Sequence, residues 1–148
     1  MMFKQKKRQA VIAGCGKLGA RIAMVLREYA YEVIIIDKDS ESFHPVFDDV
    51  KLNTKTADAC DCDALRAAGI AQADCFFAAT GSDTLNAMLA QIAVIVFACP
   101  HVYARIEDDS LQYILNHPDI HMFCSSELIA EKFRLEHSLY LRTESRSK

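Results

Sequence analysis

A glycine-rich loop near the N-terminus is the feature that most constrains how this chain can fold. The chain has five glycines, and three of them form the pattern Gly14-x-Gly16-x-x-Gly19. Residues 9–13, before the loop, form a short apolar run that is typical of a buried strand. Residues 17–29, after the loop, have the apolar spacing of an amphipathic helix. This order predicts a strand, a tight turn and a helix that packs back against the strand.

The three glycines have separate roles in such a turn. Gly14 permits the tight bend, Gly16 lets the backbone approach a pyrophosphate without a Cβ in the way, and Gly19 lets the helix pack closely on the strand. The N-terminus of the helix would supply free N–H groups and partial positive charge for phosphates. The loop therefore predicts a nucleotide site, and the alternative is a glycine turn in an α/β domain that binds no nucleotide.

An acidic residue ends the next apolar run. Residues 33–36 predict a second buried strand, which ends at Asp37. A carboxylate there can accept hydrogen bonds from ribose hydroxyls and would repel a 2′-phosphate, which favours NAD or an adenosine nucleotide over NADP. Lys38 leaves an opening for NADP, and Asp37 could instead be an N-cap or a solvated turn residue. Lys17 could pair with a phosphate or be an exposed surface lysine.

The rest of the chain continues the alternation of strand and helix. The pattern predicts a doubly wound, parallel six-stranded sheet with helices on both faces, a Rossmann-like α/β fold. Gly69 is expected to end a helix, whereas Ser82 and the pair Ser125/Ser126 are expected to cap helices. The further strands are predicted at residues 50–54, 74–80, 101–106 and 120–124, and the further helices at 40–48, 61–68, 82–96, 108–116 and 125–140.

Composition excludes several classes of protein. An apolar fraction of 51% allows a buried core in a chain of 148 residues. The net charge of -3 argues against nucleic acid as the main partner. The basic tail at residues 1–8 is interpreted as solvated, with attraction to an anionic membrane surface as the alternative. The apolar run 85–99 is shorter than the ~20 residues that a bilayer requires, so we expect a soluble protein. The six cysteines are expected to be free thiols, and no metal site is predicted.

Polar residues follow the third and fourth predicted strands. Asp58 comes after the third strand, and Thr80-Gly81 come after the fourth. Doubly wound sheets bind ligands at these carboxyl ends. By contrast, no histidine with an orienting carboxylate and no nucleophile motif is evident in the sequence. The sequence therefore favours ligand binding over catalysis.

Several segments of the chain together carry a resemblance to a known family. They are VIAGCGKLGARIA and YEVIIIDKD, TADACDCDALRAAGI, ADCFFAATGSDTLNAMLA, PHVYARIEDDSLQYIL and SSELIAEKF. Taken in order, they resemble the RCK N-terminal domain, also called the TrkA-N domain, over residues 9–133. Members of this family regulate potassium channels and Trk/Ktr-type potassium uptake systems. The chain departs from the family pattern at Ala57, Cys60 and Ser126, where members have glycine, threonine and proline.

The resemblance implies a nucleotide sensor and not an enzyme. The ligand would be NAD(H) or an adenine nucleotide (ATP, ADP or AMP), with Mg²⁺ accompanying ATP. The glycine loop would hold phosphates, Asp37 the ribose, and Arg105 the terminal phosphates, while Glu127 would reach the nucleotide or metal site at a dimer interface or be a first-turn helix acid. The implied binding residues are Gly14, Cys15, Gly16, Lys17, Leu18, Gly19, Asp37, Lys38, Asp58, Ala59, Thr80, Gly81, Arg105 and Glu127.

The resemblance also implies an organisation and a place of action. We expect a tail at residues 1–8, a nucleotide-binding domain at 9–125 and a crossover or dimerisation helix with a C-terminal tail at 126–148, without the family's C-terminal RCK domain. The chain would form a homodimer or a larger ring, and would gate a membrane-embedded potassium transporter or channel from the cytoplasm or the inner membrane face. The alternatives are a nicotinamide-dependent oxidoreductase fragment and a Rossmann interaction domain that binds no nucleotide.

Overall fold

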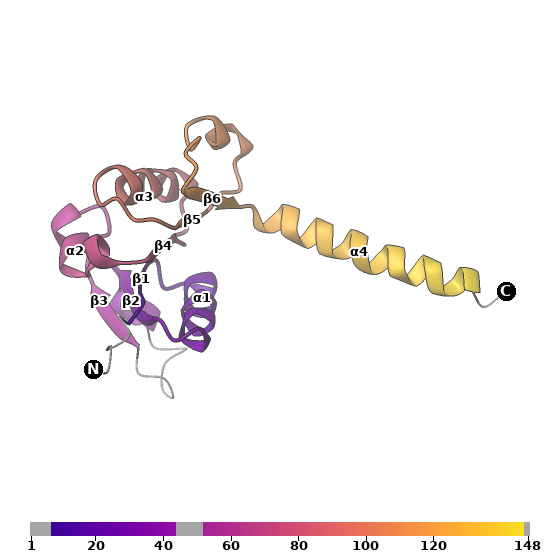
Figure 1. The fold of residues 1–148 in the computed structure, drawn as a ribbon, viewed down its shortest axis with the longest axis horizontal. Coiled ribbons are helices and arrows are strands. Elements are labelled where there is room, and N and C mark those ends of the chain that lie inside the picture. The colour runs from indigo at the N-terminus through magenta and orange to yellow at the C-terminus, as the bar shows by residue number, and fades with distance from the viewer. Residues whose placement is uncertain (1–6, 44–51, 147–148) are drawn as a thin grey trace, which may run out of the picture.

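The computed structural model of the protein describes residues 7–43 and 52–146. Within these residues the chain forms one parallel sheet with the strand order β3-β2-β1-β4-β5-β6 (Figure 1). The doubly wound α/β fold predicted from the sequence is therefore confirmed. The strands are β1 (Gln9–Ala13), β2 (Glu32–Asp37), β3 (Asn53–Thr56), β4 (Cys75–Ala78), β5 (Val102–Arg105) and β6 (Ile120–Phe123).

Helices cover the two faces of the sheet and enclose two apolar clusters. One cluster joins the sheet to α1, and the other joins it to α2 and α3. Successive residues of β1 alternate between them, because Ile12 belongs to the first cluster and Val11 to the second. The α-helices are α1 (Lys17–Glu28), α2 (Cys62–Ala67), α3 (Asp83–Ile95) and α4 (Ser125–Arg146), and the short 3₁₀ helices are η1 (Ser40–Phe43), η2 (Ile70–Gln72) and η3 (Asp109–Tyr113).

Two of the predicted helices are 3₁₀ turns where the structure describes them. The helix predicted at residues 108–116 is η3, where Asp108 accepts a hydrogen bond from the Ser110 N–H at 2.9 Å. The helix predicted at 40–48 is η1 as far as it is described, and residues 44–48 lie outside the described residues. There Asp39 accepts from the Glu41 N–H at 3.0 Å. Aspartate side chains that bond their own neighbouring backbone favour a turn over an α-helix.

Other boundaries moved by a few residues. The third strand, predicted at 50–54, is described only from residue 52 and forms β3 over Asn53–Thr56.

Two predicted helix signals are confirmed. Gly69 adopts a left-handed conformation with φ 85° after α2, and the Ser82 hydroxyl caps α3 by accepting from the Leu85 N–H at 3.3 Å.

The last helix starts differently from the expectation. Ser125 and Ser126 do not cap α4 with their own hydroxyls; instead the Glu107 carboxylate accepts from both of their N–H groups, at 2.8 and 3.3 Å. Both serine hydroxyls also donate to that carboxylate. These bonds, those of Ser125 first, lower the pKa of Glu107 to about 2. α4 then runs to Arg146, beyond the predicted end, and projects away from the sheet (Figure 1).

Two glycines bring α1 against the sheet. Gly14 has φ 100°, and a Cβ there would meet the Ala79 carbonyl oxygen at 2.7 Å. A Cβ at Gly19 would lie 2.0 Å from the Gly14 carbonyl oxygen. At Gly16 a Cβ would meet no atom of the described residues within 4 Å. The first and third glycines of the pattern therefore serve packing, and the second faces open space.

We expect Gly19→Ala and Gly16→Ala to differ sharply in stability. Gly19→Ala should lower the free energy of unfolding by about 2 kcal/mol or more, because its methyl group would overlap backbone that cannot move independently. Gly16→Ala should change it by less than about 1 kcal/mol, because the backbone is extended there (φ -76°, ψ -173°) and the space is open. Urea denaturation of the two variants measures both values, and equal losses would contradict the assigned roles.

Glu107 should make the stability of the protein depend on acid pH. The pKa of Glu107 is lower in the folded chain than the usual glutamate value of about 4.3. The ionised carboxylate therefore stabilises the folded state fully above that pH, and this stabilisation declines as the pH falls toward 2. The difference in Tm between wild type and Glu107→Gln should be full at about pH 6 and less than about half of that at pH 3. A difference that is the same at both pH values would refute the assignment.

Candidate functional site

A cleft of about 580 Å³ opens at the carboxyl ends of β1, β2 and β4. β1 and β4 are neighbours in the sheet but are not consecutive in the chain, so the connections that follow them leave in opposite directions. Ligands of doubly wound sheets bind at such a switch point. The residues that line the cleft are Gly14, Gly16, Ile36, Asp37, Lys38, Asp39, Ser42, Ala57, Asp58, Ala59, Cys60, Ala79, Thr80, Gly81, Ser82 and Leu85.

The N-terminus of α1 opens beside this cleft without a capping side chain among the described residues. Its N-cap is Gly16, and the first turn holds no acidic residue. By contrast, Asp61 caps α2 and Ser82 caps α3, and each of these helices has an aspartate in its first turn. The N–H groups and the positive end of the α1 dipole therefore remain available to an anion in the cleft.

Asp37 holds the glycine loop in place. One carboxylate oxygen, Oδ2, accepts from the Cys15 N–H at 2.7 Å, and Oδ1 accepts from the Asp39 N–H at 2.9 Å. A carboxylate has about four lone-pair positions, so two internal bonds leave capacity for further donors. Asp37 therefore orders the turn, one of the roles that the sequence left open, and its carboxylate keeps acceptor capacity on the side of the cleft.

The side of the cleft formed after β2 and β3 is acidic. Asp37, Asp39 and Asp58 line it, and Lys38 is the one lysine among the described lining residues. The pKa of Asp58 is lowered chiefly by the hydrogen bond from the Cys60 N–H, at 2.9 Å, so Asp58 is ionised at neutral pH. This wall suits hydroxyl groups, which can donate to carboxylates, and it repels phosphate.

A buried asparagine fixes the opposite wall. Asn86 has 0% exposure, and its Oδ1 accepts from the N–H and the hydroxyl of Thr80 at 2.9 and 2.6 Å. Its Nδ2 donates to the carbonyl oxygens of Thr80 and Arg105 at 3.2 and 2.9 Å. Four bonds satisfy the amide completely, so Thr80 has one defined position in the cleft. Asn86 stands in the apolar run 85–99 and in the segment ADCFFAATGSDTLNAMLA, but sequence reasoning assigned it no role.

The structure brings eight of the implied binding residues into the lining and places six elsewhere. Gly19 lies in the contact between α1 and the loop, Leu18 packs on the α1 side of the sheet, and Lys17 is exposed at the start of α1. Cys15 is buried, and burial raises its pKa. The eight residues in the lining are Gly14, Gly16, Asp37, Lys38, Asp58, Ala59, Thr80 and Gly81.

Arg105 and Glu127 lie outside the lining. The guanidinium of Arg105 pairs with Asp83 at 3.3 Å and faces Glu107 at 3.9 Å. Glu127 is exposed in the first turn of α4. The lining also contains residues that sequence reasoning did not assign, among them Asp39 and Ser42; the signal for both was their position within five residues of the acidic end of β2.

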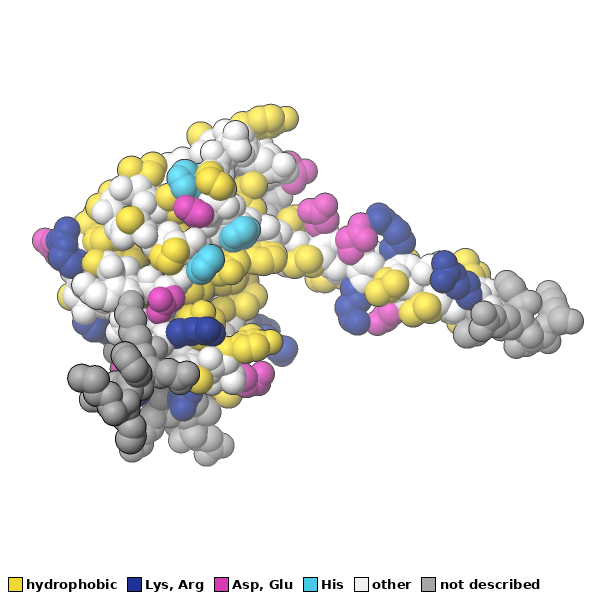
Figure 2. All heavy atoms as spheres, viewed as in Figure 1, with side chains coloured by type: hydrophobic (Ala, Val, Ile, Leu, Met, Phe, Trp, Pro, Cys, Tyr) yellow, Lys and Arg dark blue, Asp and Glu magenta, His cyan; other side chains and the backbone are white. Residues whose placement is uncertain are grey.

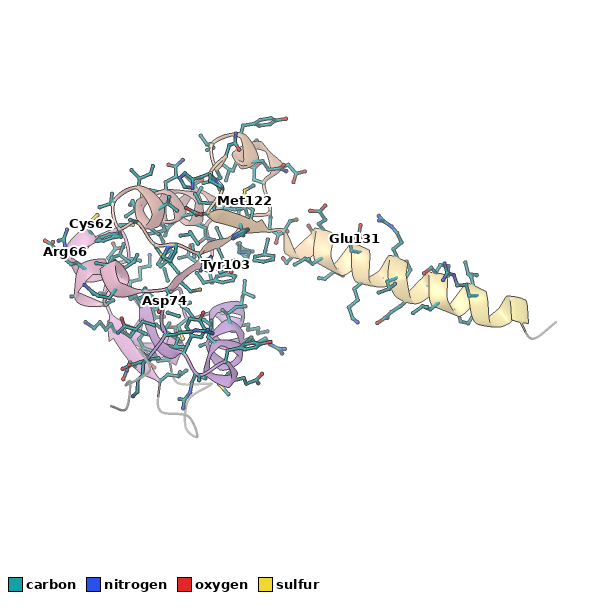
Figure 3. All side chains as sticks on the ribbon, viewed as in Figure 1. Cys62, Arg66, Asp74, Tyr103, Met122 and Glu131 are labelled. Atoms are coloured by element: carbon teal, nitrogen blue, oxygen red, sulfur yellow. The ribbon has the colours of Figure 1, made fainter. Side chains whose placement is uncertain are left out.

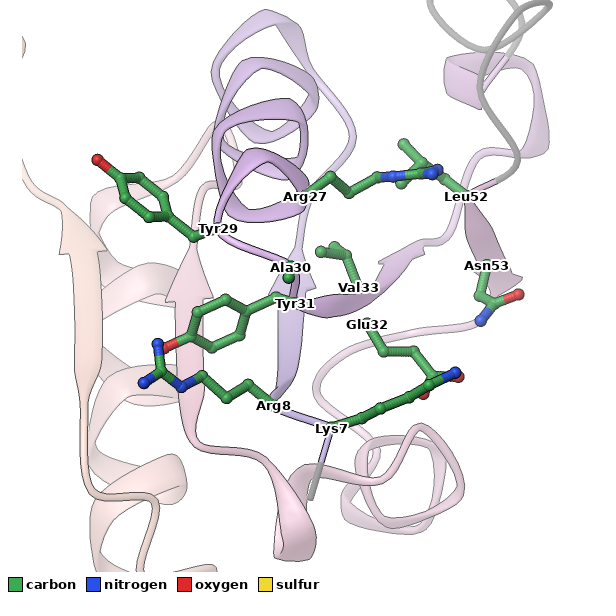
Figure 4. Close-up of a pocket in the computed structure, with 10 residues that line it drawn as sticks. All are labelled: Lys7, Arg8, Arg27, Tyr29, Ala30, Tyr31, Glu32, Val33, Leu52 and Asn53. Carbon is green, nitrogen blue, oxygen red and sulfur yellow. The ribbon is translucent and has the colours of Figure 1, made fainter. Parts of the chain in front are cut away.

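Two further hollows lie away from the glycine loop. A basic hollow at the amino ends of β1 and β2 is lined by Lys7, Arg8 and Arg27 with Tyr29 and Tyr31, as Figure 4 shows. A groove of about 530 Å³ lies between α1 and the outer strands, where the rings of Phe77, Tyr103 and Phe123 stack on one another. None of the described helices is long and apolar enough to cross a membrane.

The chain matches one family model over most of its length, the TrkA-N domain, at residues 10–126. It is 36% identical to the Trk system potassium uptake protein TrkA of Streptomyces coelicolor over 98 residues. These residues make up 66% of this chain and 44% of that protein. It is 38% identical to the TrkA homolog of Archaeoglobus fulgidus over 100 residues. These residues make up 66% of this chain and 22% of that protein. The chain thus spans less than half the length of these curated relatives.

Solved structures share the fold. The structure of GsuK bound to ADP superposes with a TM-score of 0.70 at 22% identity, covering 91% of this chain and 35% of that one. The GsuK channel bound to NAD gives a TM-score of 0.70 at 23% identity, covering 90% of this chain and 24% of that one. The family match, the curated relatives and the shared fold agree, and the chain belongs to the TrkA-N domain family.

Proposed function

We propose that this domain binds NAD(H) or an adenine nucleotide in the cleft at the glycine loop. The observation that carries the proposal is that the N-terminus of α1, which no side chain of the described residues caps, faces the same cleft as the carboxylates of Asp37 and Asp58. Phosphates suit the helix terminus, and ribose hydroxyls suit the carboxylates. The solved relative GsuK, bound to ADP in one structure and to NAD in another, supports this choice of ligands.

The role that follows from such binding is regulation of a potassium uptake system or channel. The curated relatives are Trk system potassium uptake proteins, and GsuK is a channel. The proposal is that the domain gates a membrane-embedded partner from the cytoplasmic side, with Mg²⁺ accompanying ATP when ATP is the ligand. A nucleotide can do this only if it binds two conformations of the domain unequally.

Sensing fits the cleft better than catalysis. Cys60 is the thiol in the cleft lining, and burial followed by the hydrogen bond with Asp58 raises its pKa. A raised pKa disfavours the thiolate that nucleophilic chemistry requires. The oxidoreductase alternative would also need a proton-transfer group beside the nicotinamide.

We further propose that α4 packs on a second copy of the chain. Every described side chain of α4, from residue 125 to 142, is exposed. Leu128, Leu135 and Leu139 form one row along the helix, and Ile129, Phe133 and Tyr140 form a second row about 120° around it, on the other side of the Lys132–Glu136 ion pair. Figure 2 shows apolar and charged side chains mixed along this projecting helix. Exposed apolar rows of this kind are typical of a helix that packs on other chains in an assembly.

Nucleotide binding is tested by thermal unfolding with NAD, NADH, NADP, ATP, ADP and AMP, each with and without Mg²⁺. A ligand at about 100 times its Kd should add about 2.7 kcal/mol of stability, a rise of several degrees in Tm. Gly16→Ala should retain the Tm of the unliganded protein and lose most of the shift, because its methyl group occupies the approach to the phosphates. If no nucleotide shifts the wild type at millimolar concentration, the loop is scaffold and the proposal fails.

Self-association is tested independently of nucleotide. Sedimentation equilibrium should show the wild type as a dimer or a larger oligomer, and Phe133→Asp/Leu139→Asp should shift it to monomer, because charges would replace buried apolar contacts. Glu131→Ala is the matched control, since Glu131 lies on α4 clear of the sheet (Figure 3) and pairs only locally, with Arg134, in the contacts described. A monomeric wild type at every concentration would refute this part.

A further inference from the structure

The direction of α4 is set at its base. All of its described side chains are exposed, so the domain holds this helix chiefly through its first residues. A helix of 22 residues is about 33 Å long, and a tilt of about 5° at its base would move its far end by about 3 Å. The contacts of the first turn therefore decide where α4 points.

Glu107 makes most of those contacts. Its carboxylate accepts from the N–H and hydroxyl groups of Ser125 and Ser126, and from the Cys124 thiol at 3.4 Å. Glu107 lies in the loop after β5, and Ser125 is 18 positions further along the chain. The helix is thus capped from a different part of the fold, and its base follows that loop.

The loop that carries Glu107 is tied in turn to the start of α3. The Asp83 carboxylate accepts from the N–H groups of Glu107 and Asp108, both at 2.8 Å. It also pairs with Arg105 at 3.3 Å, and the Arg105 guanidinium lies 3.9 Å from the Glu107 carboxylate. Only 20% of the Asp83 side chain is exposed, and its carboxylate connects the start of α3 to the end of β5 and to the loop after it.

The start of α3 is also a wall of the cleft. Gly81 and Ser82 line the cleft directly before Asp83. One turn further along, Asn86 bonds both Thr80 in the cleft and the Arg105 carbonyl oxygen at the end of β5. The cleft and the base of α4 are therefore joined by one continuous set of hydrogen bonds.

We propose that Glu107 is a positioning residue that couples occupancy of the cleft to the orientation of α4. This inference rests on the proposed nucleotide binding. Because Gly81 and Ser82 line the cleft, a nucleotide bound there shifts the start of α3, Asp83 carries the loop with it, and Glu107 turns the N-terminus of α4. The coupling is reciprocal, so a change at Glu107 alters nucleotide affinity although Glu107 does not line the cleft.

The test combines two measurements on the full chain, with ADP and NAD as the probes. Calorimetry gives the Kd, and NMR gives amide hydrogen exchange at residues 125–128, with and without saturating nucleotide. In the wild type, saturation should change these exchange rates at least about threefold. Glu107→Ala should raise them roughly fivefold without ligand, remove the response to nucleotide and change the Kd by about threefold or more.

Three further variants separate coupling from simple capping. Glu107→Gln, which keeps an acceptor oxygen, should restore part of the response, and Glu131→Ala should behave as wild type. Asp83→Ala should leave basal exchange near the wild-type rate, because the bonds from Glu107 to α4 remain, and should abolish the response to nucleotide. Asp83→Asn serves in its place if the alanine variant does not fold.

The outcomes distinguish this inference from the function on which it rests. If no nucleotide binds, both are overturned. If ADP or NAD binds but exchange at residues 125–128 does not respond, the proposed function stands and the coupling through Glu107 is overturned. The same holds if Glu107→Ala keeps the wild-type Kd and the wild-type response.

Discussion

The close approach of Gly19 to the Gly14 carbonyl oxygen is the contact on which the rest of the site depends. A side chain at position 19 would lie 2.0 Å from that oxygen, so only glycine lets α1 start this near to β1. The N-terminus of α1 then opens directly at the carboxyl edge of the sheet. If α1 stood further away, its N–H groups would miss the cleft that β1, β2 and β4 define.

The distribution of acidic residues complements this geometry. Side-chain carboxylates or hydroxyls accept hydrogen bonds from free backbone N–H groups at the starts of α2, α3 and α4. In the described part of the chain, α1 begins without such a side-chain acceptor. Carboxylates gather instead on the neighbouring wall, at Asp37, Asp39 and Asp58. The cleft thus has one end that attracts phosphate and another that attracts hydroxyl groups, which matches the two ends of a nucleoside phosphate.

Membership of the TrkA-N family agrees with the structure beyond the glycine loop. The match extends over residues 10–126 and ends at the start of α4. From that point the helix leaves the sheet (Figure 1), and its large apolar side chains are exposed. One part of the chain therefore has a buried apolar core, and the other carries the exposed apolar side chains of α4, the surface for which self-association is proposed.

The sequence alone determined the order of strands and helices, the glycine loop, the acid after β2 and the family. These features are local: apolar periodicity, glycine at a positive φ and a carboxylate at a strand end are all set by neighbouring residues. Eight of the residues implied by resemblance lie together for the same reason, since parallel strands bring their carboxyl ends to one edge.

Only the tertiary structure decided what the long-range polar contacts do. The sequence could not show that Asp83 and Glu107 hold Arg105, that Asn86 joins two strand ends, or that Glu107 caps α4 across 18 residues of chain. Nor could it show that residues 109–113 form a 3₁₀ turn. Such contacts depend on where distant segments come to lie, and a hydrogen bond between them leaves no periodic signal along the chain.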